Sequence, residues 1–347
     1  MDPSLSTIDA FSALALQVKC QAVNRASDRT TARTIMQAAI NALGPQIAAA
    51  KAFIGTDCRL VVLPEYWLTG FPLKESLSAW AEKACLAMYD PIYEALGEIA
   101  QQQKIFLAGN AYELDPHFPD LYFQTCFVID PSGSLILRYR RLNSMFAPTP
   151  HDVWEPYLDQ YGIEGIFPVA KTDIGNLAAI ASDEILFPEV ARCMTLRGAE
   201  IFLHSTSEVY GDARSPKEAA KLSRAVENMA YVVSANTAGI ANTPILEASV
   251  DGGSKIIDYQ GRVLTEIGAG ESMAAFAEID IAALRRYRRR GGIKNLLSRQ
   301  RLDAYAQLYQ TASIYPANAM TQGPVERSHF AQAQKSTIER LAERGMI

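Results

Sequence analysis

The sequence lacks the residue patterns of disulfide-linked, metal-binding and nucleotide-binding proteins. Its five cysteines include no pair at Cys-X-X-Cys spacing, and an odd number of unpatterned thiols favours reduced, mostly buried side chains. They are Cys20, Cys58, Cys85, Cys126 and Cys193. The four histidines show no helical or hairpin metal-ligand spacing. The segment "GAGES" at 268–272 lacks the lysine and the strand–loop–helix context of a phosphate loop. We therefore expect no metal, no nucleotide and no other cofactor.

The chain also lacks the positive charge that nucleic acids and anionic membranes attract. Its 347 residues carry a net charge of −5, and the pI is near 5.5. Both values argue against a nucleic acid or a membrane surface as the main partner. No window approaches the ~18 uninterrupted apolar residues that a membrane span requires. The first residues, "MDPSLSTIDAF", show neither the basic nor the apolar region of an export signal. These absences predict a soluble, cytoplasmic protein with no nucleic-acid or membrane partner.

One basic run, "RRYRRR" at 285–290, contrasts with the negative net charge of the chain. Such a run is more typical of a solvated helix end or a subunit contact than of a nucleic-acid site. It opens a mostly helical segment, 285–347, that includes the amphipathic stretch "LLSRQRLDAYAQLY". This arm has too little apolar surface to stand alone as a domain. We therefore expect it to lie on another surface, that of a partner subunit.

The chain has an ordinary globular composition, with 49% hydrophobic and 20% charged residues. In its first half we predict a strand within 13–23 and a helix over 29–55 that breaks near Gly44-Pro45. A buried strand follows, beginning at residue 58 and stopping at Pro64. The segment 75–105 is predicted to be helical, with a break at Asp90-Pro91.

The second half repeats this rhythm of strands and helices. A strand at 177–182 precedes a helix at 188–198, and further strands and a helix follow. Two similar hairpin signatures, "FVIDPSGSLIL" and "KIIDYQGRVLT", lie about 130 residues apart. Because hairpins interrupt the alternation, the pattern predicts mixed sheets with helices outside, arranged in two similar halves.

Polar residues stand where predicted strands end. The stretch "LAAIASDEILFPEVAR" at 177–192 is a buried strand that runs into a helix, with Ser182-Asp183-Glu184 at the corner. A nucleophile usually sits at such a corner, yet the sequence places no histidine or lysine beside Ser182. The exits of other strands carry Glu65 and Arg141.

These segments resemble the motifs of the carbon–nitrogen hydrolase (nitrilase) superfamily, whose members carry a Glu-Lys-Cys triad. The stretch "LVVLPEYWLTGFP" is similar to the first motif and puts Glu65 at the general base. In "LRYRRLNSMF", Arg141 stands where the lysine is expected. In "AAIASDEILFPEVARCMTLRGAEIFL", counting back from Phe187 puts Ser182 at the cysteine and Asp183 at an aromatic position. Two later segments, 223–239 and 252–288, support the match.

The resemblance implies an α/β fold, a four-layer αββα sandwich with a C-terminal helical arm. It implies a carbon–nitrogen hydrolase-like domain over 10–285, and leaves 286–347 as the arm at a subunit interface. It also implies a homodimer or higher homo-oligomer that pairs through outer helices. The helices near 188–200 and 215–229 carry small and apolar residues suited to such a face.

The departures from the triad bear directly on the chemistry. In the family's reaction a thiolate attacks the substrate carbon, glutamate acts as base and lysine stabilises the tetrahedral anion. A serine hydroxyl ionises less readily than a thiol, so Ser182 needs a desolvated Glu65, with which we expect contact directly or through one water. Arg141 either stabilises the anion or forms an ion pair with nearby carboxylates. Asp183 either selects a cationic substrate or balances Arg141.

Further candidates for substrate binding surround these residues. Tyr66 and Trp67 either line the site or belong to the core. In amidases of this family a loop brings a second carboxylate to the site, and the segment 147–162 offers Asp152 or Glu155 for that role. Three residues complete the set: Asp183, Glu184 and His204. His204 is alternatively a satisfied core histidine.

Three functions remain open from the sequence. The first is a hydrolase of a small non-peptide amide, nitrile or carbamoyl compound that uses Glu65, Arg141 and Ser182. The second is a catalytically silent family member that binds a small molecule or a protein. The third is non-covalent acid–base chemistry by Glu65 with Asp183 and Glu184. Because one inactivating replacement of the nucleophile would not explain Arg141 and Asp183 as well, we favour natural divergence.

Overall fold

The computed structural model describes residues 8–209, 215–321 and 326–347. Within these ranges the long strands form two six-stranded sheets. The first sheet contains β1 (Phe11–Ala15), β3 (Cys58–Val62), β4 (Phe106–Asp115), β5 (Phe118–Ile129), β6 (Leu135–Arg140) and β14 (Phe276–Ile279). The second contains β7 (Ala170–Thr172), β8 (Gly175–Ala181), β9 (Ile201–Ser205), β10 (Tyr231–Ala235), β12 (Lys255–Ile257) and β13 (Val263–Glu266). The short strands β2 (Cys20–Gln21) and β11 (Ile240–Ala241) pair with each other.

Both sheets are mixed, and each has parallel strands at its centre. The first sheet has the order β14-β1-β3-β4-β5-β6, with β1, β3 and β4 parallel. The second has the order β13-β12-β10-β9-β8-β7, with β8, β9 and β10 parallel. The two predicted hairpins are confirmed as β5–β6 and β12–β13. In their turns Asp130 and Asp258 accept backbone N–H groups two and four residues further on, as turn aspartates do.

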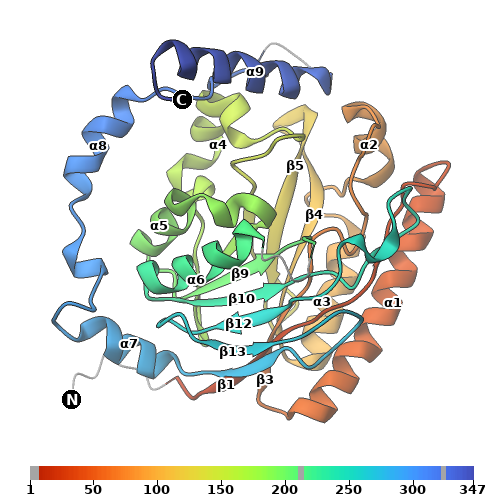
Figure 1. Ribbon diagram of the computed structural model, residues 1–347. Coiled ribbons are helices and arrows are strands. Elements are labelled where there is room, and N and C mark those ends of the chain that lie inside the picture. The colour runs from red at the N-terminus through yellow and green to blue at the C-terminus, as the bar shows by residue number, and fades with distance from the viewer. Residues whose placement is uncertain (1–7, 210–214, 322–325) are drawn as a thin grey trace.

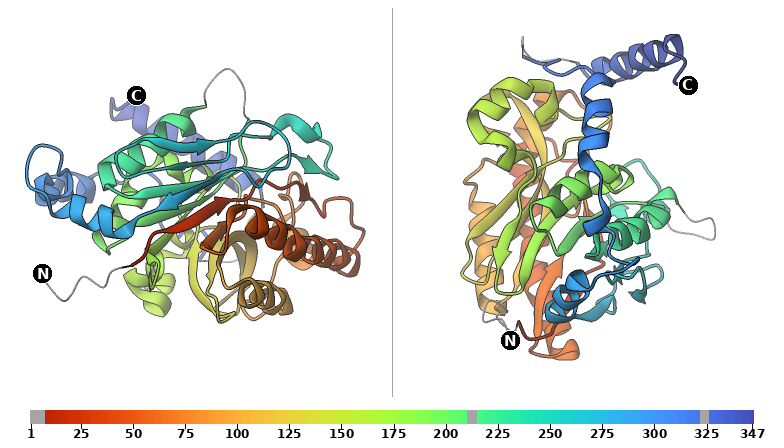
Figure 2. Two further views of the ribbon diagram at one scale, coloured as in Figure 1. Left: turned by 90° about the horizontal axis from the view of Figure 1, so that it is seen from below. Right: turned by 90° about the vertical axis from the view of Figure 1, so that its left-hand side faces the viewer.

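The sheets pack face to face, and helices cover their outer faces (Figures 1 and 2). Val62 and Ala108 of the first sheet share one buried cluster with Ile180, Leu203 and Val233 of the second. The helices α1 (Arg29–Ile54) and α3 (Pro91–Gln103) lie outside the first sheet, and α5 (Pro188–Leu196) and α6 (Pro216–Asn228) lie outside the second. The predicted four-layer αββα sandwich is therefore present.

The two predicted helix breaks have different outcomes. The break in the first helix is wrong, because α1 continues through Pro45. Its continuous buried face, which includes Met36, Leu43 and Ile47, outweighs the lost backbone hydrogen bond. The break at Asp90-Pro91 is confirmed: α2 (Leu77–Ala84) ends before it, and Asp90 caps α3.

The segment after Arg141 is more ordered than predicted. It forms the 3-10 helix η1 (Pro150–Val153) and the helix α4 (Trp154–Ile166). Two further 3-10 turns, η3 (Glu247–Ser249) and η4 (Leu297–Arg299), lie in later connections.

The predicted boundary between domain and arm, at 285–286, falls inside α7 (Ile281–Arg289), and the arm beyond it contains α8 (Leu302–Thr311) and α9 (Ser328–Glu343). Its end packs on its own chain, since Met320 and Phe330 are buried in the core of the first half. Arg327 donates to the Phe146 carbonyl (2.8 Å) and to the Tyr122 hydroxyl (3.0 Å). The large side chains of α8 are exposed: Leu302, Tyr305, Leu308 and Tyr309. Contact between the arm and a partner subunit stays a prediction, and it now concerns α8.

Across the described ranges, no helix combines the length and the apolar character needed to cross a membrane.

Candidate active site

The ends of the central parallel strands meet at one edge of the sandwich. Two hydrogen bonds join the chain after β3 to the chain at the end of β9. Glu65 N donates to the Thr206 carbonyl (3.2 Å), and Ser205 Oγ donates to the Leu63 carbonyl (2.8 Å). The carboxyl ends of parallel strands are where α/β proteins place their ligand sites. These two bonds bring Glu65, on one sheet, to the strand ends of the other sheet.

Ser182 occupies the corner between β8 and the 3-10 helix η2 (Ser182–Leu186). Its φ is 51°, a left-handed conformation that costs a non-glycine residue about 1–2 kcal/mol. The residue is only 5% exposed. A strained residue at a strand-to-helix corner is the geometry that presents a nucleophilic side chain.

His204, on β9, fixes the backbone of Ser182. The fully buried imidazole lies 2.7 Å from the Ser182 carbonyl through Nε2 and 2.9 Å from Ser234 Oγ through Nδ1. Because a carbonyl can only accept, Nε2 carries the proton and Nδ1 accepts from the Ser234 hydroxyl. Burial, together with the charges of Lys221 and Lys217, holds the pKa of His204 well below its usual value. His204 is therefore a neutral positioning residue, in place of the predicted substrate contact.

Arg141 is held by four partners in the buried interior. Nη1 donates to Gln124 Oε1 (2.7 Å) and lies 3.7 Å from Glu65 Oε1, and Nε donates to the Asn143 carbonyl (2.8 Å). Nη2 forms an ion pair with Asp183. Although burial disfavours its charge, Glu65 and other neighbours raise the pKa of Arg141. Of the two alternatives for Asp183, the structure contains the charge balance with Arg141.

Glu65 is completely buried and only partly satisfied. Its Oε1 accepts from Gln124 Nε2 at 2.6 Å. Within the described part of the chain its Oε2 has no hydrogen-bond partner. A buried oxygen of this kind is costly in an apolar interior, and such atoms gather at functional sites. Glu65 thus offers one free carboxylate oxygen beside Arg141.

Glu184 has a structural role in place of the predicted substrate contact. Its carboxylate is fully buried and accepts from Tyr139 Oη (2.7 Å), Leu142 N (2.8 Å) and Asn143 N (2.7 Å). Burial raises the pKa of Glu184. The residue ties η2 to the segment that carries Arg141, and all the bonds it accepts lead into that segment or β6.

Tyr66 and Trp67 have different environments in the structure. Tyr66 follows Glu65 with a φ of 64° and lies parallel to Tyr112, with 6.4 Å between ring centroids. Burial and the Glu65 charge raise the pKa of the Tyr66 hydroxyl, which therefore stays protonated beside the carboxylate. Trp67 is 2% exposed and belongs to the core of the first half. Tyr66 remains a candidate for substrate contact, whereas Trp67 is a core residue.

Asp152 and Glu155 both take part in local structure, and a role of either in substrate binding stays a prediction. Asp152 Oδ2 accepts from both Thr149 N and Thr149 Oγ1 at 2.8 Å, which completes a capping box on η1. Glu155 is exposed on the first turn of α4, and its N–H donates to Asn318 Oδ1 (3.1 Å). Met320 N donates to the Asp152 carbonyl (2.9 Å). Both residues therefore lie at the junction with the C-terminal arm.

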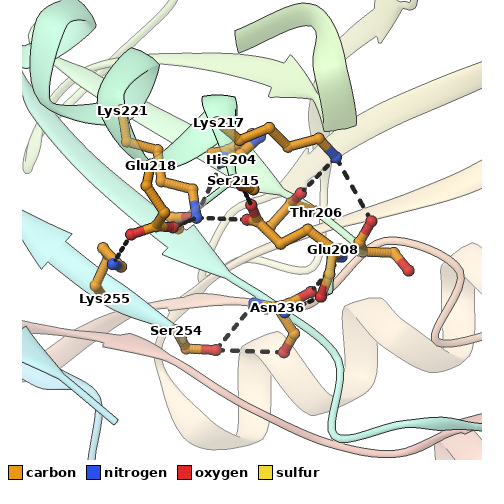
Figure 3. Close-up of polar contacts among 12 residues, drawn as sticks. His204, Thr206, Glu208, Ser215, Lys217, Glu218, Lys221, Asn236, Ser254 and Lys255 are labelled. Carbon is orange, nitrogen blue, oxygen red and sulfur yellow. Dashed lines mark hydrogen bonds and ion pairs between the residues drawn. The ribbon is translucent and has the colours of Figure 1, made fainter. Parts of the chain in front are cut away.

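Lys217 reaches the site from the first turn of α6, and the sequence analysis missed it. Its Nζ lies 3.3 Å from Ser182 Oγ, 3.3 Å from Thr206 Oγ1 and 3.5 Å from the Ser207 carbonyl. Figure 3 shows the side chain extending toward Thr206. The direct partner of the Ser182 hydroxyl is thus this amine; among the described residues Glu65 makes no direct hydrogen bond to it. The sequence contains one signal for Lys217. A lysine in the first turn of a helix is unfavourable beside the positive end of the helix dipole, and such exceptions often mark functional residues.

A buried ion network anchors the helix that carries Lys217. Lys221, one turn along α6, donates to Glu208 (2.5 Å) and Glu218 (2.7 Å), and Lys255 of β12 pairs with Glu218 (Figure 3). Asn236 accepts from Glu208 N (3.0 Å) and donates to the Glu208 carbonyl (2.9 Å). These bonds connect α6 to the ends of β9 and β10 and to β12, so the position of Lys217 is fixed by its own helix.

A family comparison accounts for this arrangement of strand ends. The carbon-nitrogen hydrolase family model matches residues 17–289, which is most of the chain. The chain belongs to the carbon-nitrogen hydrolase family. Relatives with known names are distant from it.

The nitrilase and fragile histidine triad fusion protein of Caenorhabditis elegans is 27% identical over 252 residues, covering 72% of this chain and 54% of that protein. A formamidase of Pseudomonas syringae is 28% identical over 237 residues, covering 68% of this chain and 64% of that protein. The omega-amidase of Mus musculus is 24% identical over 212 residues, covering 61% and 74%. The match thus spans between about half and two thirds of the first two relatives.

Solved structures agree with this membership at the level of the fold. A nitrilase-superfamily protein of Saccharomyces cerevisiae superposes with a TM-score of 0.63 at 20% identity, covering 82% of this chain and 95% of that one. A carbon-nitrogen hydrolase of Helicobacter pylori superposes with a TM-score of 0.63 at 19% identity, covering 86% and 98%. At these identities the likeness establishes the shared fold.

Proposed function

We propose that this carbon-nitrogen hydrolase family member cleaves a carbon–nitrogen bond of a small non-peptide amide, nitrile or carbamoyl compound, with Ser182 as nucleophile. The observation that carries the proposal is the strained corner at Ser182, where a buried hydroxyl meets Lys217 close to Glu65 and Arg141. Without such neighbours, the strained backbone of Ser182 would lower the stability of the fold and serve no function.

The reaction follows from these groups. For an amide or carbamoyl compound, Ser182 Oγ attacks the carbonyl carbon, the C–N bond breaks as ammonia or an amine leaves, and an ester to Ser182 remains. Water then attacks the ester and releases the acid and the free hydroxyl. Glu65 Oε2 and the guanidinium of Arg141 supply a fixed acceptor and a fixed positive charge in a buried site, where electrostatic effects are strong.

Two named relatives favour an amide, although a third carries nitrilase in its name. Two of the matched proteins are a formamidase and an omega-amidase. The burial of Glu65, Arg141 and Ser182 favours a small substrate, since each is at most 7% exposed.

The test is turnover of a panel of short aliphatic amides, nitriles and N-carbamoyl compounds, measured as ammonia release. The wild type should turn over at least one class, and Ser182→Ala should lose activity by several orders of magnitude, on the scale seen when a nucleophile is removed. Ser223→Ala, an exposed serine on α6, serves as the matched control and should keep full activity. Equal turnover by Ser182→Ala and the wild type would contradict the proposal.

A second candidate function is ligand binding without turnover. The observation that favours it is the set of partners around Arg141, which leaves that side chain committed to Gln124, Asn143 and Asp183. The same panel separates the two. Binding of an amide by calorimetry without any ammonia release would support this second function. Non-covalent chemistry through Glu184 is disfavoured, because its carboxylate already accepts several hydrogen bonds.

A further inference from the structure

The hydroxyl of Ser182 has an amine as its polar neighbour. Lys217 Nζ lies 3.3 Å from Ser182 Oγ, although 35 residues separate them. A nucleophile and a base in hydrogen-bond reach, with the base oriented by further groups, form the recurring arrangement of covalent catalysis. The 3.3 Å separation is within the range expected before substrate tightens the contact.

Further groups orient the amine. Thr206 Oγ1 and the Ser207 carbonyl lie 3.3 and 3.5 Å from Nζ, both on the chain that leaves β9. A neutral amine has two N–H donors and one lone pair, so it can donate to these two acceptors and accept from the Ser182 hydroxyl. The position of Lys217 therefore does not depend on substrate.

The remaining basic groups at the site are poor proton acceptors. Arg141 stays protonated in proteins and is paired with Asp183. His204 presents its protonated Nε2 to the Ser182 carbonyl and its Nδ1 to Ser234, so neither nitrogen faces the hydroxyl. Glu65 has one free oxygen, but the hydroxyl is bonded to the amine. Among the described residues, Lys217 is the titratable side chain that lies within hydrogen-bond distance of the Ser182 hydroxyl, and it can both lose and accept a proton.

We propose that Lys217 is the general base that activates Ser182, so that a serine–lysine pair performs the chemistry; this role rests on the proposed function. A base must be neutral before it acts, and the surroundings favour the neutral amine. Burial lowers the pKa of Lys217, and Lys221 and Arg141 lower it further. The carboxylates Glu65 and Glu208 oppose these effects, and the net direction is downward.

The proton path balances without any co-reactant except water. Neutral Lys217 takes the proton of Ser182 as Oγ bonds to the carbonyl carbon and the carbonyl electron pair moves to oxygen. When that pair returns, the C–N bond breaks and the Lys217 ammonium protonates the leaving nitrogen. Lys217 then removes a proton from the attacking water. It returns that proton to Ser182 Oγ as the ester bond breaks.

The decisive variant is Lys217→Arg. Arginine keeps the positive charge and the donors but does not accept a proton at ordinary pH. A structural role for Lys217 therefore predicts that Lys217→Arg remains active, whereas a general base predicts that kcat falls by 10²–10⁴-fold, the usual contribution of such a group. Lys335→Met, an exposed lysine on α9, is the control and should stay within twofold of the wild type.

The pH dependence and a rescue give two independent readouts. In the wild type, kcat should rise with pH to a plateau, with a midpoint below the ~10.4 of a free lysine, and this limb should be absent in Lys217→Met.

Replacing Ser182 by cysteine lowers the need for a base, because a thiol ionises near 8.5. Lys217→Met should therefore cost less than about tenfold in the Ser182→Cys background. An equal loss in both backgrounds would overturn the general-base role.

A fluorophosphonate probe separates failure of this inference from failure of the proposed function. The probe should label Ser182 in the wild type, and label Lys217→Arg at least 100-fold more slowly. Labelling at Ser182 without turnover of any amide would leave the pair intact and overturn the substrate class. Turnover and labelling unchanged in Lys217→Arg would overturn the role of Lys217 and leave the proposed function standing. Absence of both labelling and turnover in the wild type would overturn both.

Discussion

The carboxylate of Glu184 holds the two halves of the site together, so its removal should destabilise the protein. In Glu184→Ala, one buried and two partly buried donors lose their acceptor: the Tyr139 hydroxyl, and the N–H groups of Leu142 and Asn143. Each orphaned buried donor costs about 1–3 kcal/mol. The two partly buried donors lie at the low end of this range, so the free energy of unfolding should fall by about 3–5 kcal/mol in total, unless water reaches the space.

Glu184→Gln should be much milder. The glutamine keeps one oxygen for Leu142 and Asn143, and the Tyr139 hydroxyl can rotate to accept from the new amide. Burial raises the pKa of Glu184, which means that the fold does not favour its charge. Loss of the charge should therefore cost less than about 1.5 kcal/mol, within the range of one ordinary hydrogen bond.

Urea unfolding followed by tryptophan fluorescence and far-UV circular dichroism measures both effects. The two transitions should coincide, which justifies a single free energy of unfolding. Glu189→Ala, an exposed glutamate on the first turn of α5, is the control and should change stability by no more than about 0.5 kcal/mol. The reasoning fails if Glu184→Ala stays within about 1 kcal/mol of the wild type, or if the glutamine and alanine variants are equally unstable.

Three further predictions use the same groups. Ser182→Gly should be inactive yet about 1 kcal/mol more stable than Ser182→Ala in urea unfolding, because glycine tolerates the φ of 51°. Lys221→Met should lower the free energy of unfolding by about 3–5 kcal/mol, since it leaves the buried carboxylate of Glu208 without its ion-pair partner and Glu218 with Lys255 alone, whereas Lys335→Met should not. The ring signals of His204 should not titrate between pH 8 and 5 by NMR, because its folded pKa lies well below 6.5. The unfolded chain then binds the proton more readily, so this histidine lowers stability as pH falls below 6.5, and an inflection near 6.5 in its signals would contradict the buried contacts.

The motifs in the sequence predicted the strand ends but not every neighbour of those ends. Glu65 and Ser182 each follow an apolar strand of a parallel set, whose carboxyl ends meet at one edge. Arg141 follows β6, which runs in the same direction as β4 because both are antiparallel to β5. The turns at Asp130 and Asp258 were predictable for a local reason, because their side chains bond within four residues. Charge predicted a carboxylate partner as one of two alternatives for Arg141, and the structure contains that pair.

The rest depended on tertiary contacts. Lys217 meets Ser182 because α6 packs against η2, and no pattern within 35 residues of sequence specifies that approach. The roles of Trp67 and Glu184 were not predictable from the sequence either, because both residue types occur in substrate-binding sites and in buried structural positions. Their burial and partners decide the role. Pro45 was misleading because a proline breaks a helix only when no buried face holds the helix together.

The central claim is that Ser182 carries the acyl group during hydrolysis of a carbon–nitrogen bond. Rapid acid quenching of a single turnover, followed by intact and peptide mass spectrometry, tests it most directly. The account predicts a mass increase equal to the acyl group on the peptide that contains Ser182, and none in Ser182→Ala. Hydrolysis at the full rate with the acyl group on another residue, or with no adduct at any quench time, would contradict it.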